Sequence, residues 1–161
     1  MSTKDDPPKP AHVHPVIPPV TVLIRVAWVC YTVILLTATH WPKLAIKGPI
    51  ERTDLVLHMS AFGLWTLLLG GTGWVCSRCC VARRALVVCL IGIGFGAFDE
   101  TTQPFFQRVF DWTDLAADAA GAILASVVLL IVWSWIQKRK FVQSTEASAE
   151  SVAHSPADTR S

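Results

Sequence analysis

Four long apolar blocks, separated by short polar connectors, dominate the pattern of hydrophobic and polar positions along the chain. They cover approximately residues 20–39, 55–75, 85–98 and 115–136. A helix needs about 20 apolar residues to cross a hydrocarbon core of about 30 Å. Backbone groups in lipid must be hydrogen-bonded within their own segment, so each block is expected to be helical. The pattern predicts an all-α membrane protein, a bundle of four transmembrane helices with short loops.

The two ends of the chain differ from these blocks in composition. Residues 1–19 are rich in Pro and carry two Asp, and the last residues are rich in Ser, Ala and Glu. Such segments cannot bury enough apolar surface to fold alone. We therefore predict a disordered Pro-rich tail over 1–19, a four-helix transmembrane domain over 20–140 and a disordered C-terminal tail over 141–161. The first apolar block is long and lies behind the tail, so it is expected to be a retained span and not a signal peptide.

The overall composition agrees with a membrane protein. Of the 161 residues, 52% are hydrophobic and only 16% are charged, whereas soluble domains carry about a quarter charged residues. The net charge of +2 is too small to suggest a nucleic-acid partner. Membrane lipids are the expected partners. An oligomer is left open, because four short helices would need one to form a transport pathway.

Basic residues are divided unequally between the two sides of the predicted bundle. Cytoplasmic flanks of membrane helices carry an excess of Lys and Arg. The side with more of them also holds both termini, so both termini are predicted to be cytoplasmic. The eight on that side are Lys4, Lys9, Arg78, Arg83, Arg84, Lys138, Arg139 and Lys140, and the four on the other are Lys43, Lys47, Arg52 and Arg108.

Polar residues concentrate at the predicted outer ends of three helices. Their spacing places them on shared helix faces, because residues three or four apart are neighbours on a helix. Ionisable groups within a span seldom face lipid, so a common polar pocket open to the outside is expected. The residues are Asp54 and His58 at the start of the second block, Asp99, Glu100 and Gln103 after the third, Arg108 in the loop, and Asp114 and Asp118 at the start of the fourth. Gly121 lies on the same stripe as these two aspartates and is small enough to allow close helix approach.

This ordered set resembles the VanZ-like family of bacterial integral membrane proteins. The residues that carry the resemblance are Asp54, His58, Glu100, Gln103, Arg108, Asp114, Asp118 and Gly121, within approximately 54–125. The chain departs from the family pattern at two positions, where Leu55 replaces a usual Lys and Asp118 a usual Asn. The resemblance implies a multi-pass protein of the bacterial inner membrane. It also suggests a link to envelope maintenance or to resistance against the glycopeptide antibiotic teicoplanin.

Three interpretations of the pocket stay open at this stage. In the first, the pocket binds an envelope lipid, a wall precursor or a related phosphate or carboxylate ligand, through Asp54, Gln103, Arg108, Asp114 and Asp118. In the second, it belongs to a membrane-embedded hydrolase or transferase with His58 and Glu100 as acid and base. In the third, the polar network is purely structural. A divalent metal ion at His58, Glu100 and Asp118 is a further alternative, since imidazole and carboxylate are suitable ligands.

Simpler roles are also available for several of these residues. Asp54 and Asp114 could each cap the N-terminus of a helix, and Arg108 could pair with one of the acids. Cys76, Cys79 and Cys80 form a Cys-x-x-Cys-Cys cluster in the loop on the more basic side. Because that loop is predicted to be cytoplasmic, we expect reduced thiols there.

Overall fold

The computed structural model describes residues 18–41, 53–77 and 79–153. It contains four long helices and one short 3₁₀ helix, and no strand occurs in these ranges. The elements are α1 (Pro19–Thr39), α2 (Thr53–Gly71), α3 (Val81–Thr102), η1 (Gln103–Phe106) and α4 (Trp112–Ala153). Each long helix has the length and hydropathy of a membrane span. The prediction of a multi-pass, all-α membrane protein is confirmed.

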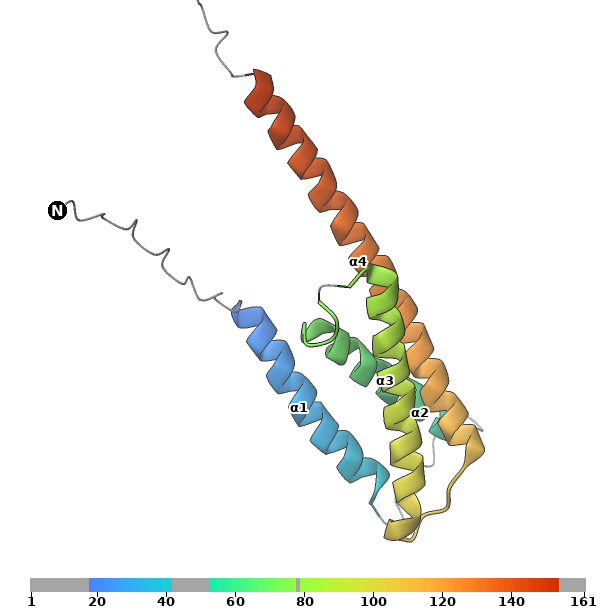
Figure 1. Cartoon of the computed structure of the whole chain (residues 1–161). Coiled ribbons are helices and arrows are strands. Elements are labelled where there is room, and N and C mark those ends of the chain that lie inside the picture. The colour runs from blue at the N-terminus through green and yellow to red at the C-terminus, as the bar shows by residue number, and fades with distance from the viewer. Residues whose placement is uncertain (1–17, 42–52, 78, 154–161) are drawn as a thin grey trace, which may run out of the picture.

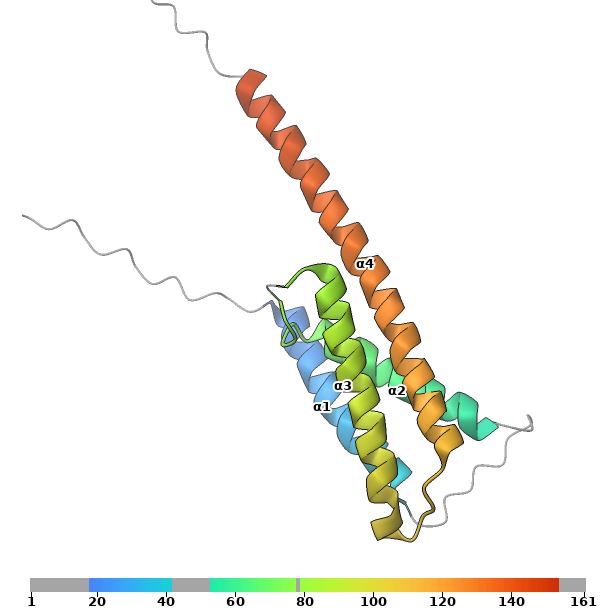
Figure 2. The ribbon, with the colours of Figure 1, turned by 45° about the vertical axis from the view of Figure 1, so that its right-hand side comes forward.

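The helices form a bundle in which α2 and α4 are central. α4 packs against both α2 and α3, and α1 packs mainly against α2. α3 and α4 run side by side in both views (Figures 1 and 2), and α4 continues well beyond the bundle. The N-terminal end of α1 lies at the end of the bundle from which α4 emerges (Figure 1).

The core of the bundle is built from large side chains of α2. Phe62, Trp65 and Leu69 are buried and pack with residues of the other three helices. The Trp65 ring stacks on Phe95 of α3 at 4.1 Å between centroids, and its indole N–H donates to Thr32 of α1 at 2.8 Å. Many apolar side chains on the outside of the helices are exposed. This is the distribution expected where lipid surrounds the bundle.

Small residues bring α2 and α4 into close backbone contact. A Cβ atom added to Gly121 of α4 would collide with the carbonyl oxygen of Met59 of α2. A Cβ atom on Gly63 of α2 would lie 3.3 Å from the carbonyl oxygen of Gly121. Close contact of this kind is typical of membrane helices with small residues at their interface. It also sets the distance between the polar side chains that α2 and α4 present.

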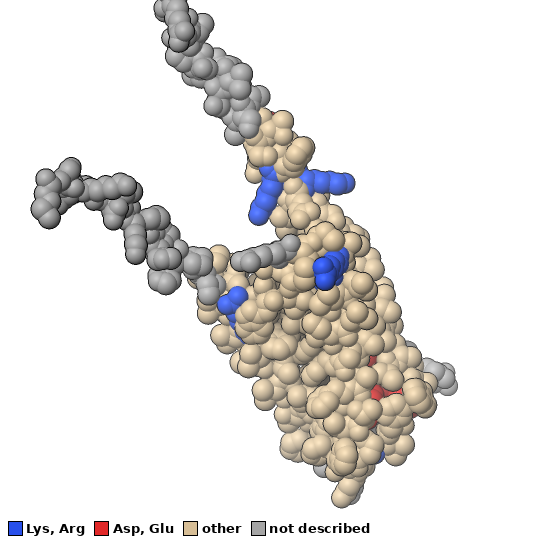
Figure 3. Space-filling model, viewed as in Figure 1, with Lys and Arg blue, Asp and Glu red and all other residues tan. Residues whose placement is uncertain are grey.

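Among the described residues, Lys and Arg gather at one end of the bundle and Asp and Glu at the other (Figure 3). At the basic end, where α4 leaves the bundle, Arg25 donates to the carbonyl of Thr72, and Arg84 donates to the carbonyl of Gly70. Both acceptors lie at the C-terminal end of α2, where helical carbonyls lack intrahelical partners. The opposite end, which we call the acidic end, holds the C-termini of α1 and α3 and the N-termini of α2 and α4.

The prediction of a disordered C-terminal tail over 141–161 is wrong for most of that segment, because α4 continues through residue 153. The segment after residue 141 contains Ala, Gln and Glu, which favour helix, and contains neither Gly nor Pro before Pro156. Its composition therefore allows the membrane helix to propagate into water. The N-terminal tail over 1–17 and residues 154–161 lie outside the described residues.

The loop between α2 and α3 also differs from expectation. Cys76 and Cys79 form a disulfide, with their Cα atoms 5.3 Å apart, so the expectation of reduced thiols is wrong for this pair. A turn closed by the hydrogen bond from the Cys79 N–H to the Cys76 carbonyl, at 2.9 Å, brings the two side chains together. Cys80, the third member of the cluster, is free and exposed.

Candidate functional site

Polar side chains from three helices meet at the acidic end. His58 comes from the second turn of α2, Glu100 from the last turn of α3, and Asp114 and Asp118 from the start of α4. Asp114 and Asp118 are four residues apart, so both point to the same side of α4. The structure thus brings together His58, Glu100, Asp114 and Asp118, whereas helical spacing alone predicts only that the two aspartates share a face of α4.

The His58 imidazole lies between the two aspartates of α4. Its Nδ1 atom is 3.0 Å from Asp118 Oδ1, and its Nε2 atom is 3.5 Å from Asp114 Oδ2. A neutral imidazole has a single N–H, and an ionised carboxylate only accepts hydrogen bonds. A neutral ring can therefore donate to only one of these two carboxylates.

Asp118 lies at a close contact between α3 and α4. Its side chain is fully buried, and a Cβ atom on Gly96 of α3 would come within 2.9 Å of the Asp118 Cβ atom. Gly96 therefore provides the room for this carboxylate between α3 and α4. Asp118 Oδ2 and Asp114 Oδ1 are both buried and have no hydrogen-bond partner. Two carboxylate oxygens of the site are thus left unsatisfied by the described residues.

Glu100 is held by hydrogen bonds on both of its oxygens. The Gln103 amide donates to Glu100 Oε1 at 2.6 Å and to Asp99 Oδ2 at 3.3 Å. The backbone N–H of Asp111, in the following loop, donates to Glu100 Oε2 at 3.2 Å. Gln103 is therefore a connector between two buried carboxylates, and Glu100 has a fixed orientation.

Arg108 and Asp54 stand at the edge of the site. Together with His58 they line a cavity of about 160 Å³ between α1 and α2, whose other walls are mainly apolar. Within the described residues the Arg108 guanidinium forms no ion pair, so the simpler role of pairing with an acid is not observed there. The guanidinium forms part of the wall of this cavity.

Asp111 caps the N-terminus of α4. The alternative prediction, that Asp114 is this cap, is wrong. Asp111 immediately precedes the helix, and its carboxylate accepts from the N–H and the hydroxyl of Thr113, each at 2.7 Å. Both hydrogen bonds lower the pKa of Asp111, and the one from the backbone N–H has the larger effect. Asp54 is likewise inside the first turn of α2, which begins at Thr53, so it is not the cap of that helix.

A metal ion is chemically compatible with the centre of the site. His58, Glu100 and Asp118 each offer one ligand atom, and these three atoms lie within 4.8 Å of one another. Imidazole nitrogen with carboxylate oxygen is a donor set for first-row divalent metals. The acid and base roles assigned to His58 and Glu100 stay a prediction.

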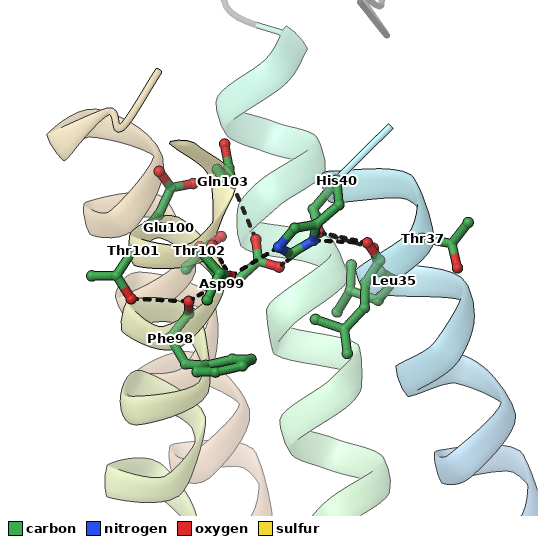
Figure 4. A network of polar contacts seen from close by, with 12 residues as sticks. Leu35, Thr37, His40, Phe98, Asp99, Glu100, Thr101, Thr102 and Gln103 are labelled. Carbon is green, nitrogen blue, oxygen red and sulfur yellow. Dashed lines mark hydrogen bonds and ion pairs between the residues drawn. The ribbon is translucent and has the colours of Figure 1, made fainter. Parts of the chain in front are cut away.

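A second polar cluster adjoins the site and was not predicted as part of it (Figure 4). Asp99 Oδ1 accepts from the Thr39 hydroxyl at 2.7 Å and lies 3.6 Å from His40 Nδ1. His40 Nε2 is 2.9 Å from the Thr102 hydroxyl. The sequence pattern predicts Asp99 at the outer end but indicates no role for His40. The available signal was that His40 directly follows the first apolar block, at the end of the bundle where Asp99 lies.

The chain matches a known protein family. A family model described as VanZ/LLP1 matches residues 25–134, which is well over half of the chain. The match contains His40 and the whole of the site from Asp54 to Asp118. No curated protein and no solved structure matches the chain.

Proposed function

Because the chain belongs to the VanZ/LLP1 family of membrane proteins, we propose that its acidic end binds the phosphate or carboxylate group of an envelope lipid or cell-wall precursor. The observation that carries this proposal is the position of Arg108, without an ion pair among the described residues, on the wall of the cavity between α1 and α2. A guanidinium offers planar, bidentate hydrogen bonding to phosphate and carboxylate.

The walls of the cavity favour a ligand that is partly apolar. Leu35 and Ala38 of α1, and Leu57 and Phe62 of α2, line it beside Arg108 and His58. These apolar residues all lie within candidate membrane spans. A lipid could therefore place its charged group against Arg108 while its chain stays in the hydrocarbon. The volume of about 160 Å³ suits one such group and not a whole lipid.

Two further parts of the proposal concern the cellular setting. We place the protein in the bacterial inner membrane, with both termini in the cytoplasm and the acidic end outside. In that setting the pocket would meet lipid-linked precursors on the outer leaflet, where glycopeptides such as teicoplanin also act. A role in envelope maintenance or in teicoplanin resistance would follow from binding such a ligand.

Binding to a phosphate-bearing lipid tests the proposal directly. The full chain, purified in detergent, is titrated with phosphatidic acid, and diacylglycerol with the same acyl chains is the uncharged comparison. Arg108→Ala should weaken phosphatidic acid binding by roughly tenfold or more, because a hydrogen bond to a charged group contributes about 1.5–3 kcal/mol. Arg83→Ala is the matched control, since Arg83 is exposed and lies on α3 near the basic end. Equal affinity of the Arg108 and Arg83 variants, or equal binding of both lipids, would contradict the proposal.

The enzymatic alternative is favoured by one observation, the fixed arrangement of His58 and Glu100. Asp118 orients the imidazole, and Gln103 with the Asp111 N–H orients the carboxylate. Groups held in this way could transfer protons during hydrolysis of an envelope lipid. A Glu100→Gln variant separates the two functions. If it folds, still binds phosphatidic acid and has lost a lipid turnover that the wild type shows, the enzyme is favoured.

A further inference from the structure

The acidic end carries more negative charge than the described residues can neutralise. Glu100, Asp114 and Asp118 surround one imidazole, and Glu100 and Asp118 are fully buried. Arg108 is the only Lys or Arg among the described residues of this end, and it forms no ion pair with them. Buried carboxylates without a partner are strongly unfavourable, and more so inside a membrane span. Within the described residues the cluster therefore lacks a compensating positive charge, which protons or a cation can supply.

The geometry favours a cation over protons alone. A protonated carboxyl group would donate a hydrogen bond. The second oxygen of Asp118, however, is fully buried and has neither a hydrogen-bond donor nor an acceptor as partner. Asp118 Oδ1 is in contact with the imidazole of His58, so the unpartnered carboxylate belongs to the same cluster. Ligand atoms of His58, Glu100 and Asp118 lie within 4.8 Å of one another. They come from three different helices, which fixes their separation.

We propose that His58, Glu100 and Asp118 bind one divalent first-row metal ion, of the Mn²⁺ or Zn²⁺ class, with Asp114 as an additional oxygen donor. One imidazole with two or three carboxylates suits these ions, whereas Ca²⁺ and Mg²⁺ prefer oxygen ligands alone and Cu⁺ prefers sulfur. The Gln103 amide and the Asp111 N–H hold Glu100 from outside the cluster, as residues around metal ligands commonly do.

The metal site goes beyond the proposed ligand and does not depend on it. It also removes an electrostatic difficulty, because an anionic group approaching Arg108 would otherwise meet three carboxylates nearby. A bound divalent cation would reduce that repulsion, because it neutralises two of the three negative charges. Metal binding can be measured with no lipid added, so the two proposals can fail separately.

The test compares two isosteric changes in buried carboxylates. Asp118→Asn removes a proposed ligand, whereas Asp99→Asn alters a carboxylate that is equally buried but contacts Thr39 and Gln103 instead. All proteins carry His12→Ala and His14→Ala, which removes the histidine pair of the N-terminal tail. After treatment with a chelator and dialysis, the full chain in detergent is titrated with Mn²⁺ or Zn²⁺. Bound metal is measured by mass spectrometry of the element, and thermal stability is followed in parallel.

We expect one equivalent of metal in the wild type and in Asp99→Asn, with a rise in melting temperature on loading. Asp118→Asn should bind the metal at least about tenfold more weakly. Loss of a residue that only hydrogen-bonds to a metal ligand already lowers metal affinity about 10- to 100-fold. Absence of a stoichiometric ion in the wild type would overturn the proposal, and so would equal affinity in the two variants. If Asp118→Asn does not fold, pulsed EPR of the Mn²⁺-loaded wild type decides. A coordinated imidazole gives nitrogen modulation, and its absence would exclude His58 as a ligand.

Discussion

At the scale of single residues, Asp99 shows how the acidic end depends on contacts between helices. It is fully buried and adjoins Glu100 in sequence, and it has a hydrogen-bond partner on α1. Thr39 of α1 donates to one of its oxygens and Gln103 to the other. Since each partner satisfies an oxygen that is buried from water, losing one should cost about 1–3 kcal/mol. Asp99 thus connects α1 to the rest of the polar network.

A Thr39→Val change tests this connection, because valine keeps the shape of threonine but has no hydroxyl. We expect the variant to unfold at a lower temperature in detergent, with a loss of about 1–3 kcal/mol for the buried oxygen left without its donor. Thr37→Val is the control. Thr37 is exposed and points away from the cluster (Figure 4), and its hydroxyl donates to the carbonyl of Val33 in its own helix. Equal melting temperatures for the two variants would mean that the Thr39–Asp99 contact contributes nothing.

The sequence predicted some residues of the site because helical spacing is independent of the tertiary fold. Asp114 and Asp118 had to share a face of α4 once that segment was a helix. His40 and its contact with Thr102 could not be found in this way. The two residues are 62 positions apart, and their meeting depends on how α1 and α3 lie against each other. Likewise, only the loop conformation showed that Asp111, and not Asp114, caps α4.

At the scale of elements, the lengths of the apolar blocks predicted the four helices but not their ends. Membrane thickness requires a minimum length and sets no maximum. α4 therefore has room to continue to Ala153, well past its apolar block. The contact between α2 and α4 was also only partly predictable. Gly121 was noted as a small residue, whereas its partner Gly63 was visible only after the helices were placed.

Replacing Gly121 by Ala should separate α2 from α4. The added methyl group would collide with the backbone carbonyl of Met59, which cannot move without displacing α2. Overpacking of this kind costs about 1–3 kcal/mol, so we expect a lower melting temperature and weaker metal binding. Gly94→Ala on α3 is the matched control, because nothing lies within 4 Å of a Cβ atom there. A Gly121 variant as stable as the Gly94 variant would contradict the close contact.

At the scale of the whole molecule, two features bear on its orientation and point in opposite directions. Lys and Arg are concentrated at the basic end, which favours a cytoplasmic location for that end. The Cys76–Cys79 disulfide lies at the same end, and cytoplasmic disulfides are rare. We give the charge distribution more weight, because it involves many residues in several segments. The bond between Cys76 and Cys79 joins two residues of a single turn and so concerns one loop only.

Labelling of intact cells should resolve this conflict. In a cysteine-free background, Val109→Cys and Ser77→Cys place single thiols at exposed positions of the acidic and basic ends. A membrane-impermeant maleimide should react only with the cysteine introduced at position 109. The pocket with Arg108 would then face the outside, where lipid-linked wall precursors are accessible. Reaction only at position 77 would place the acidic end in the cytoplasm and would be consistent with a stable disulfide outside. The search for a ligand would then move to the phosphate-bearing lipids of the inner leaflet.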